Sequence, residues 1–117
     1  MSTSVFIVED AADLRLLYRL SLTRAGFEVI GDASSLTEAR AALPDVHADV
    51  LLVDVTLPDG AGQQVVDEIR RLASTALLVV CSGHAVPTAS GADAWLAKTH
   101  TLDVGDALAS CLAQLSR

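Results

Sequence analysis

Two kinds of segment alternate along the chain, and this alternation limits the possible fold more than any other feature. Short apolar runs rich in Val and Ile are too short for helices and are typical of buried strands. Between them lie longer stretches whose apolar residues repeat at helical spacing. The predicted strands are Ser4–Val8, Phe27–Ile30, Val50–Val53, Ala76–Cys81 and Ala94–Ala97.

Helix boundary signals accompany the amphipathic stretches. Gly26 is a natural stop for the first helix. Ser35 with Glu38 forms a capping-box signature, and Pro44 ends that helix. Gly105, near the start of the last helix, costs roughly 1 kcal/mol if it lies in the helix interior. Thr101 is the predicted cap of the last helix. The residues that repeat at helical spacing in the first, third and last predicted helices are Leu14, Leu17, Tyr18 and Ser21, then Val65, Val66 and Ile69, then Val104, Leu108, Cys111, Leu112 and Leu115.

Strands that alternate with helices predict a parallel sheet covered on both faces. Right-handed crossovers leave few topologies for five strands, and the order 2-1-3-4-5 is a common doubly wound arrangement. We therefore predict an α/β, flavodoxin-like, doubly wound five-stranded parallel sheet. Ligands of such sheets bind beyond the carboxyl ends of the strands, at the switch point between strands 1 and 3. The length of 117 residues predicts a single domain over 1–117, without an effector domain.

Charge and composition exclude several classes of function. The formal net charge is −7, with 8 Lys and Arg against 15 Asp and Glu. Such a balance repels phosphate backbones and predicts no direct nucleic-acid partner. The apolar runs are strand-sized and no basic, apolar leader opens the chain, so we expect a cytoplasmic protein that does not enter a membrane. The two cysteines, Cys81 and Cys111, lack metal-ligand spacing and are interpreted as core residues.

Polar residues stand where four of the predicted strands end. Glu9 and Asp10 follow the first strand, Asp54 the third, Ser82 the fourth and Lys98 the fifth. If strands 1 and 3 are neighbours, three carboxylates share one crevice, and like charges this close cannot all remain ionised without a cation. Mg²⁺ suits a site of few carboxylates completed by waters and phosphate.

Each of these signals is weak when taken alone. An acidic pair after a strand is usually solvated or caps a helix, and we give Glu9 and Asp10 about one chance in four of binding metal on that basis. A single Asp, Ser or Lys at a strand end is usually a turn or surface residue. The joint placement of all of them at one edge of one sheet is the informative observation, and it is strengthened because Lys98 is the one lysine in the chain.

The chain resembles the two-component response-regulator receiver family, which is CheY-like. The resemblance spans nearly the whole chain, and the segment that begins with the third strand is its most specific part. The matching stretches are Val5-Phe6-Ile7-Val8-Glu9-Asp10, Leu51-Leu52-Val53-Asp54-Val55-Thr56-Leu57-Pro58-Asp59-Gly60, Val79-Val80-Cys81-Ser82-Gly83 and Gly91-Ala92-Asp93-Ala94-Trp95-Leu96-Ala97-Lys98.

The resemblance implies a role for each residue of the crevice. Asp54 is the nucleophile that takes a phosphoryl group from a histidine kinase or a histidine phosphotransfer protein. Asp10 binds Mg²⁺ directly, Glu9 does so mainly through water, and the Thr56 carbonyl completes the protein ligands. The remaining pair, Ser82 and Lys98, hold the phosphoryl oxygens. The family is a regulatory phosphoacceptor and no classical enzyme; at most it phosphorylates itself from small donors and dephosphorylates itself.

Three departures from the family pattern affect the output end of the chain. Thr99 follows Lys98 where the family usually has a proline in a cis peptide, and a non-proline cis bond costs ~2.5–4 kcal/mol, so a reshaped loop is expected. The segment His84–Asp93 is too short for a helix of three turns, so the fourth helix is predicted to be stunted or absent. Trp95 stands where the family often has a switching Tyr or Phe.

Three alternatives remain at this stage. A small aspartate-nucleophile phosphohydrolase needs a second Asp two residues after the nucleophile, where this chain has Thr56. A nucleotide-binding module has little support, because Gly60-Ala61-Gly62 is a lone glycine cluster and the turn after the first strand is acidic. The serious alternative is a degenerate receiver that acts as an interaction module without phosphorylation, which the short fourth-helix segment and Thr99 favour.

Overall fold

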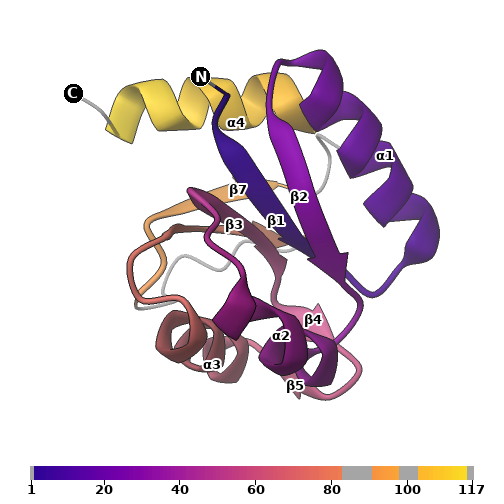
Figure 1. Ribbon diagram of the computed structural model, residues 1–117, viewed down its shortest axis with the longest axis vertical. Coiled ribbons are helices and arrows are strands. Elements are labelled where there is room, and N and C mark those ends of the chain that lie inside the picture. Colours follow the sequence, from indigo (N-terminus) through magenta and orange to yellow (C-terminus); the bar gives the residue numbers. More distant parts are fainter. Residues whose placement is uncertain (1, 83–90, 98–102, 116–117) are drawn as a thin grey trace.

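A parallel five-stranded sheet forms the centre of the molecule (Figure 1). The computed structural model describes residues 2–82, 91–97 and 103–115. The strand order is β2-β1-β3-β6-β7, and β4 and β5 form a separate two-stranded hairpin. The strands of the sheet are β1 (Ser4–Val8), β2 (Glu28–Ala33), β3 (Val50–Asp54), β6 (Leu77–Ser82) and β7 (Ala94–Ala97), and the hairpin strands are β4 (Thr56–Leu57) and β5 (Gly60–Ala61).

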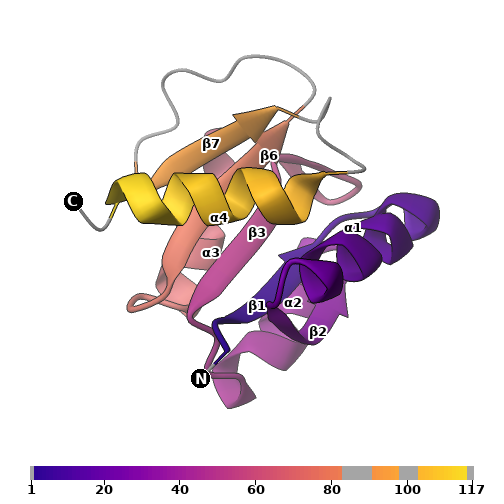
Figure 2. The same cartoon turned by 90° about the horizontal axis from the view of Figure 1, so that it is seen from above.

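Helices cover both faces of the sheet. Figure 1 and Figure 2 show two of the helices on one face, α1 (Ala12–Arg24) and α4 (Val104–Leu115). The other face carries α2 (Leu36–Ala42), a 3₁₀ turn at Leu43–Asp45, and α3 (Gln63–Leu72). No helix among the described residues combines the length and the apolar character needed to cross a bilayer.

The predicted flavodoxin-like fold is confirmed, with β6 and β7 as the fourth and fifth strands of the sheet. Ser4–Val8 and Ala94–Ala97 are strands with the predicted bounds, whereas β2, β3 and β6 each extend beyond the predicted carboxyl end. These extensions include polar residues such as Asp32 and Ser82, which the apolar pattern cannot mark as strand. The β4–β5 hairpin was not predicted, because strands of two residues leave no periodic signal.

The sheet separates two apolar clusters, one under each pair of helices. Side chains alternate along a strand, so Val5 and Ile7 face α1 and α4 while Phe6 and Val8 face α2 and α3. All of Val50–Asp54 is buried. Burial on both faces explains why the central strands appear in the sequence as continuous apolar runs.

The start of α2 follows the predicted capping pattern in part. The Ser35 hydroxyl accepts a hydrogen bond from the Glu38 backbone N–H at 3.1 Å, as a capping box requires. The Glu38 carboxylate accepts from the N–H of Ser34 at 2.8 Å, whereas the motif would use the N–H of Ser35. The helix ends at Ala42, two residues before Pro44, as the sequence predicts.

The contact between α1 and α4 explains the glycine at the start of α4. Gly105 is the second residue of that helix and is buried. A Cβ atom at this position would lie 2.4 Å from the backbone oxygen of Ser21 and 2.7 Å from the Cβ of Ala25. The Gly105 N–H also donates to the Ser21 hydroxyl at 2.9 Å. Glycine therefore allows the two helices to approach closely, at the expense of helix propensity.

Part of the predicted output end lies outside the described residues. Residues 83–90, Lys98, Thr99 and the predicted cap Thr101 belong to this group. Residues 91–93, at the end of the segment predicted to lack a full fourth helix, are not helical. The stunted or absent fourth helix therefore stays a prediction; the helix labelled α4 is the one that the sequence predicts last.

Candidate functional site

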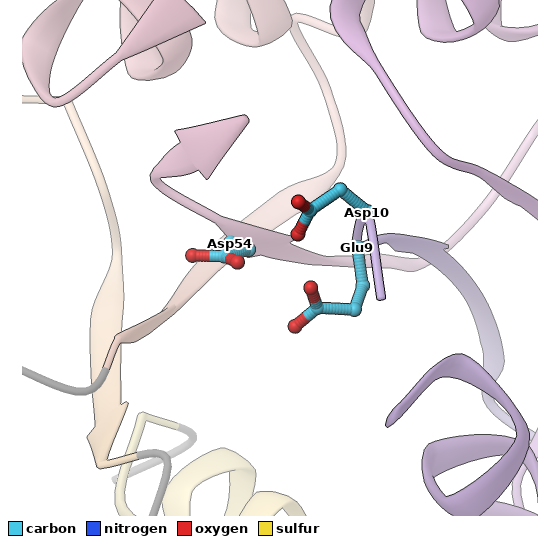
Figure 3. A group of neighbouring side chains, drawn as sticks. All are labelled: Glu9, Asp10 and Asp54. Atoms are coloured by element: carbon cyan, nitrogen blue, oxygen red, sulfur yellow. The ribbon is translucent and has the colours of Figure 1, made fainter. Parts of the chain in front are cut away.

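Three carboxylates gather where β1 and β3 end. Glu9 and Asp10 directly follow β1, and Asp54 is the last residue of β3. The two strands are hydrogen-bonded neighbours, with Val8 opposite Val53. One oxygen from each of the three side chains lies within 4.8 Å of the others. Figure 3 shows the three side chains beside one another. The structure thus brings together the acidic residues that the sequence predicted to meet.

The three carboxylates differ in their exposure to solvent. Glu9 is fully buried and Asp54 is 3% exposed, whereas Asp10 is exposed. Two buried negative charges with a third beside them are costly to desolvate unless a cation balances them. Asp10 leaves one side of the cluster open to water, which suits a cation that retains part of its hydration shell.

Contacts with the start of α1 fix the acidic pair after β1. The Glu9 carboxylate accepts a hydrogen bond from the Ala11 N–H at 3.2 Å. Ala11 is the N-cap residue of α1 and has no side chain that could cap the helix. The Arg15 guanidinium donates to the carbonyls of Glu9 at 2.8 Å and Asp10 at 3.1 Å. Arg15 therefore holds the turn that carries both carboxylates, a role that the sequence analysis missed.

The hairpin after β3 orients Asp54. The Thr56 N–H donates to Oδ1 of Asp54 at 3.0 Å, so the carboxylate is held by the backbone two residues further on. Thr56 opens β4 and pairs with Ala61 of β5. Thr56, whose carbonyl is the predicted metal ligand, therefore also donates a hydrogen bond to Asp54, the candidate phosphoacceptor.

A buried polar pair lies beside the acidic cluster on the α1 and α4 face. Cys81 is the register partner of Asp54, and its Sγ lies 3.5 Å from the Tyr18 hydroxyl. Burial raises the pKa of Tyr18, and the contact with Cys81 and the charges of Glu9 and Asp54 raise it further. Tyr18 therefore remains protonated and neutral. The prediction that Cys81 is a core residue is confirmed, and Cys111 is half-buried.

The fourth and fifth strands lead to the same edge of the sheet. The backbone of Ser82 ends β6 and pairs with Ala97 of β7, so these strand ends are adjacent. The Ser82 side chain and all of Lys98 lie outside the described residues, and their roles stay predictions. Trp95 on β7 is 43% exposed and, with Cys111 of α4, lines a hollow of about 470 Å³.

The donor set fits a small hard cation such as Mg²⁺. Glu9, Asp10 and Asp54 supply carboxylate oxygens, which are the ligands that Mg²⁺ and Ca²⁺ prefer over softer metals. No cysteine or histidine belongs to this cluster as it is described, which separates it from sites for zinc or copper.

Comparison with known proteins identifies the family. The family model described as the response regulator receiver domain matches residues 5–103. The chain belongs to this family. The chemotaxis protein CheY of Thermotoga maritima is 34% identical over 82 residues, which cover 70% of this chain and 68% of that protein.

Solved structures support the same fold. A receiver domain (CheY-like) from Methylobacillus flagellatus superposes with a TM-score of 0.82 at 24% identity, covering 98% of this chain and 99% of that one. The response regulator TrrA from Thermotoga maritima, solved in complex with Mg²⁺ and BeF, gives a TM-score of 0.79 at 21% identity, covering 97% and 98% of the two chains. These structures show the receiver fold.

Family membership decides between several of the functional alternatives. Receiver domains are regulatory and not classical enzymes, so the phosphohydrolase and nucleotide-binding interpretations are set aside. Membership implies phosphoacceptor signalling in a two-component system.

Proposed function

We propose that this receiver is a working switch: Asp54 accepts a phosphoryl group from a histidine kinase or a histidine phosphotransfer protein, with Mg²⁺ bound beside it. The observation that carries the proposal is the meeting of Glu9, Asp10 and Asp54 within 4.8 Å at one edge of the sheet. Asp10, Asp54 and the Thr56 carbonyl would hold the metal, and Glu9 would act mainly through water. The chain would work in the cytoplasm and signal through protein contacts, without binding nucleic acid.

The residues of the site divide the chemistry between them. An oxygen of Asp54 attacks phosphorus and forms an acyl phosphate, while the P–N bond to the donor histidine breaks and the imidazole recovers its proton. The Thr56 N–H holds the carboxylate plane during this step. Bound Mg²⁺ supplies positive charge that offsets the negative charge of carboxylates and phosphoryl group. Ser82 and Lys98 would bind the phosphoryl oxygens, and water later hydrolyses the acyl phosphate.

The comparison with TrrA supports the metal in this proposal. That protein was solved with Mg²⁺ and BeF, and its chain superposes on nearly all of this one. The chemistry of the three carboxylates supports the same conclusion independently, because their crowded negative charge favours a divalent cation.

Incubation with acetyl phosphate and Mg²⁺, followed by intact mass measurement, tests the proposal. We expect the wild-type chain to gain the mass of one phosphoryl group. Asp54→Asn, and wild type with the metal chelated, should gain none. A wild-type chain that remains unmodified at high donor concentration would refute the proposal and would favour the degenerate receiver, which acts as an interaction module without phosphorylation.

A further inference from the structure

The turn between β4 and β5 caps a helix that precedes it in the chain. Oδ1 of Asp59 accepts the N–H of Leu36 at 2.8 Å. Oδ2 accepts the N–H of Thr37 at 2.9 Å and the Thr37 hydroxyl at 2.7 Å. Together with the Ser35 bond to Glu38, these contacts satisfy the first three N–H groups of α2. The start of α2 therefore depends on a carboxylate more than 20 residues further along the chain.

The electrostatics of this cap are favourable. A carboxylate at a helix N-terminus faces the positive end of the helix dipole. The three hydrogen bonds from Thr37 and Leu36 lower the pKa of Asp59 to about 2. Asp59 is therefore ionised throughout the physiological range and binds the helix as an anion.

A packing contact joins the same turn to the same helix. Gly60 follows Asp59, and a Cβ atom built on it would lie 2.5 Å from Cδ1 of Leu36. Leu36 is fully buried in the cluster under α2 and α3. The turn thus rests against the first residue of α2 through side-chain hydrogen bonds and through close packing, which fixes its position from two sides.

The other end of this short segment is the acidic site. Thr56 donates its N–H to Asp54 and pairs with Ala61 across the hairpin. The Gly62 N–H donates to the Val55 carbonyl at 2.7 Å and closes the loop. The segment 54–62 is therefore a closed loop. Its first residue, Asp54, belongs to the acidic site, and its turn at Asp59 contacts α2.

We propose that Asp59 is a positioning residue for the metal site, because it anchors to α2 the hairpin that presents Thr56. The inference rests on the proposed function, since it takes the Thr56 carbonyl as a metal ligand. Loss of the anchor would let the hairpin move, so part of the binding free energy of the cation would be spent on ordering it. Linkage then requires the reverse effect: bound metal must stabilise the start of α2.

A matched pair of variants separates this role from simple helix capping. Asp59→Ala removes two backbone capping bonds of α2 and the Thr37 hydroxyl bond, and with them the hydrogen-bonded anchor of the hairpin. Ser35→Ala removes the bond to Glu38 from the same helix end and leaves the hairpin attached. Each should destabilise the chain by about 1 kcal/mol, as lost N-caps usually do. A third variant, Thr37→Val, removes the hydroxyl bond to Asp59 and keeps both backbone bonds.

Mg²⁺ titration by calorimetry, without any phosphodonor, provides the main measurement. We expect Asp59→Ala to raise the dissociation constant about fivefold, at the lower end of typical coupling between sites. Ser35→Ala should stay within about twofold of wild type, and Thr37→Val should fall between the two. Equal weakening by Asp59→Ala and Ser35→Ala, or wild-type affinity in Asp59→Ala, would overturn the proposal.

Amide hydrogen exchange, measured in the wild-type chain and in Asp59→Ala, tests the reverse coupling. Mg²⁺ should slow exchange at Leu36 and Thr37, and this protection should vanish in Asp59→Ala. Exchange at these amides that does not respond to Mg²⁺ would contradict the role of Asp59. A wild-type chain that binds no Mg²⁺ would also overturn it, whereas the acetyl phosphate assay decides separately whether Asp54 accepts phosphate.

Discussion

The two faces of the sheet are closed in different ways. On one face, α4 packs against α1, and the Gly105 N–H donates a hydrogen bond to the neutral Ser21 hydroxyl. The Tyr18–Cys81 pair is buried on this face. On the other face, α2 is seated by the carboxylate of Asp59. Both helices have N–H groups bound by a side chain from a remote element. The first solution depends on close fit and the second on charge, so the two faces should respond to different perturbations.

Gly105→Val should produce the largest effect, because it tests the close fit directly. The new side chain would meet the Ser21 carbonyl and the Ala25 methyl, and overpacking of this kind typically costs up to about 3 kcal/mol. Urea unfolding should show that loss. Ala113→Val on the exposed side of α4 is the control and should change stability by less than about 0.5 kcal/mol. Similar stabilities for the two variants would mean that the contact between α1 and α4 at Gly105 is not close-packed.

Alkaline pH should weaken the α1 and α4 face through Tyr18. In the unfolded chain this side chain ionises near pH 10, whereas burial raises its pKa in the folded protein. The stabilisation is therefore complete below pH 10 and is lost as pH rises above it. Tyrosinate absorbance is specific, because the chain has one tyrosine. We expect that absorbance to appear only with unfolding; its appearance in the folded chain near pH 10 would show that Tyr18 is not buried.

Ser21→Ala should moderately lower the stability of the chain by weakening the same contact between α1 and α4. It removes the hydroxyl that accepts the Gly105 N–H, and losing such a bond typically costs about 1 kcal/mol. Thermal unfolding measures the cost. Because Ser21 joins α1 to α4 on one face of the sheet, whereas the hairpin is bonded to α2 on the other face, the Mg²⁺ affinity should match that of wild type. A weakened affinity would mean that both faces, and not one, are coupled to the acidic site.

Acid should produce the smallest effect, on the α2 face. The pKa of Asp59 is lowered from 3.8 to about 2 in the folded chain. Its contribution to stability is therefore present above pH 3.8 and is lost as pH falls toward 2. The difference in melting temperature between wild type and Asp59→Asn should shrink across this window. A difference that does not change with pH would show that charge contributes nothing to the cap.

The parts of the molecule that the sequence predicts are those set by local periodicity. Apolar runs predict the positions of the sheet strands, and the rule that ligands bind at the carboxyl ends of strands predicts that Glu9, Asp10 and Asp54 meet, as they do in the structure. Arg15 and Asp59 were missed, because their importance lies in bonds to carbonyls and amides that no spacing rule specifies.

Gly105 shows the same limit in another form. The sequence alone indicates a residue that weakens the helix. The need for glycine at this position becomes clear only in the folded chain, where Ser21, 84 residues earlier, packs against it. Propensity describes a residue with its neighbours in the chain, whereas this glycine is required by a neighbour in space.

The hollow between β7 and α4 allows the spacing of these two elements to be followed by tryptophan fluorescence. The chain has one tryptophan and two cysteines, and of the cysteines Cys81 is buried. Trp95 and Cys111 line the same hollow. Burial raises the pKa of the Cys111 thiol, so labelling with a small quencher would proceed best in mildly alkaline buffer. The emission of Trp95 would then report changes in the spacing between β7 and α4 in real time, without any amino-acid substitution.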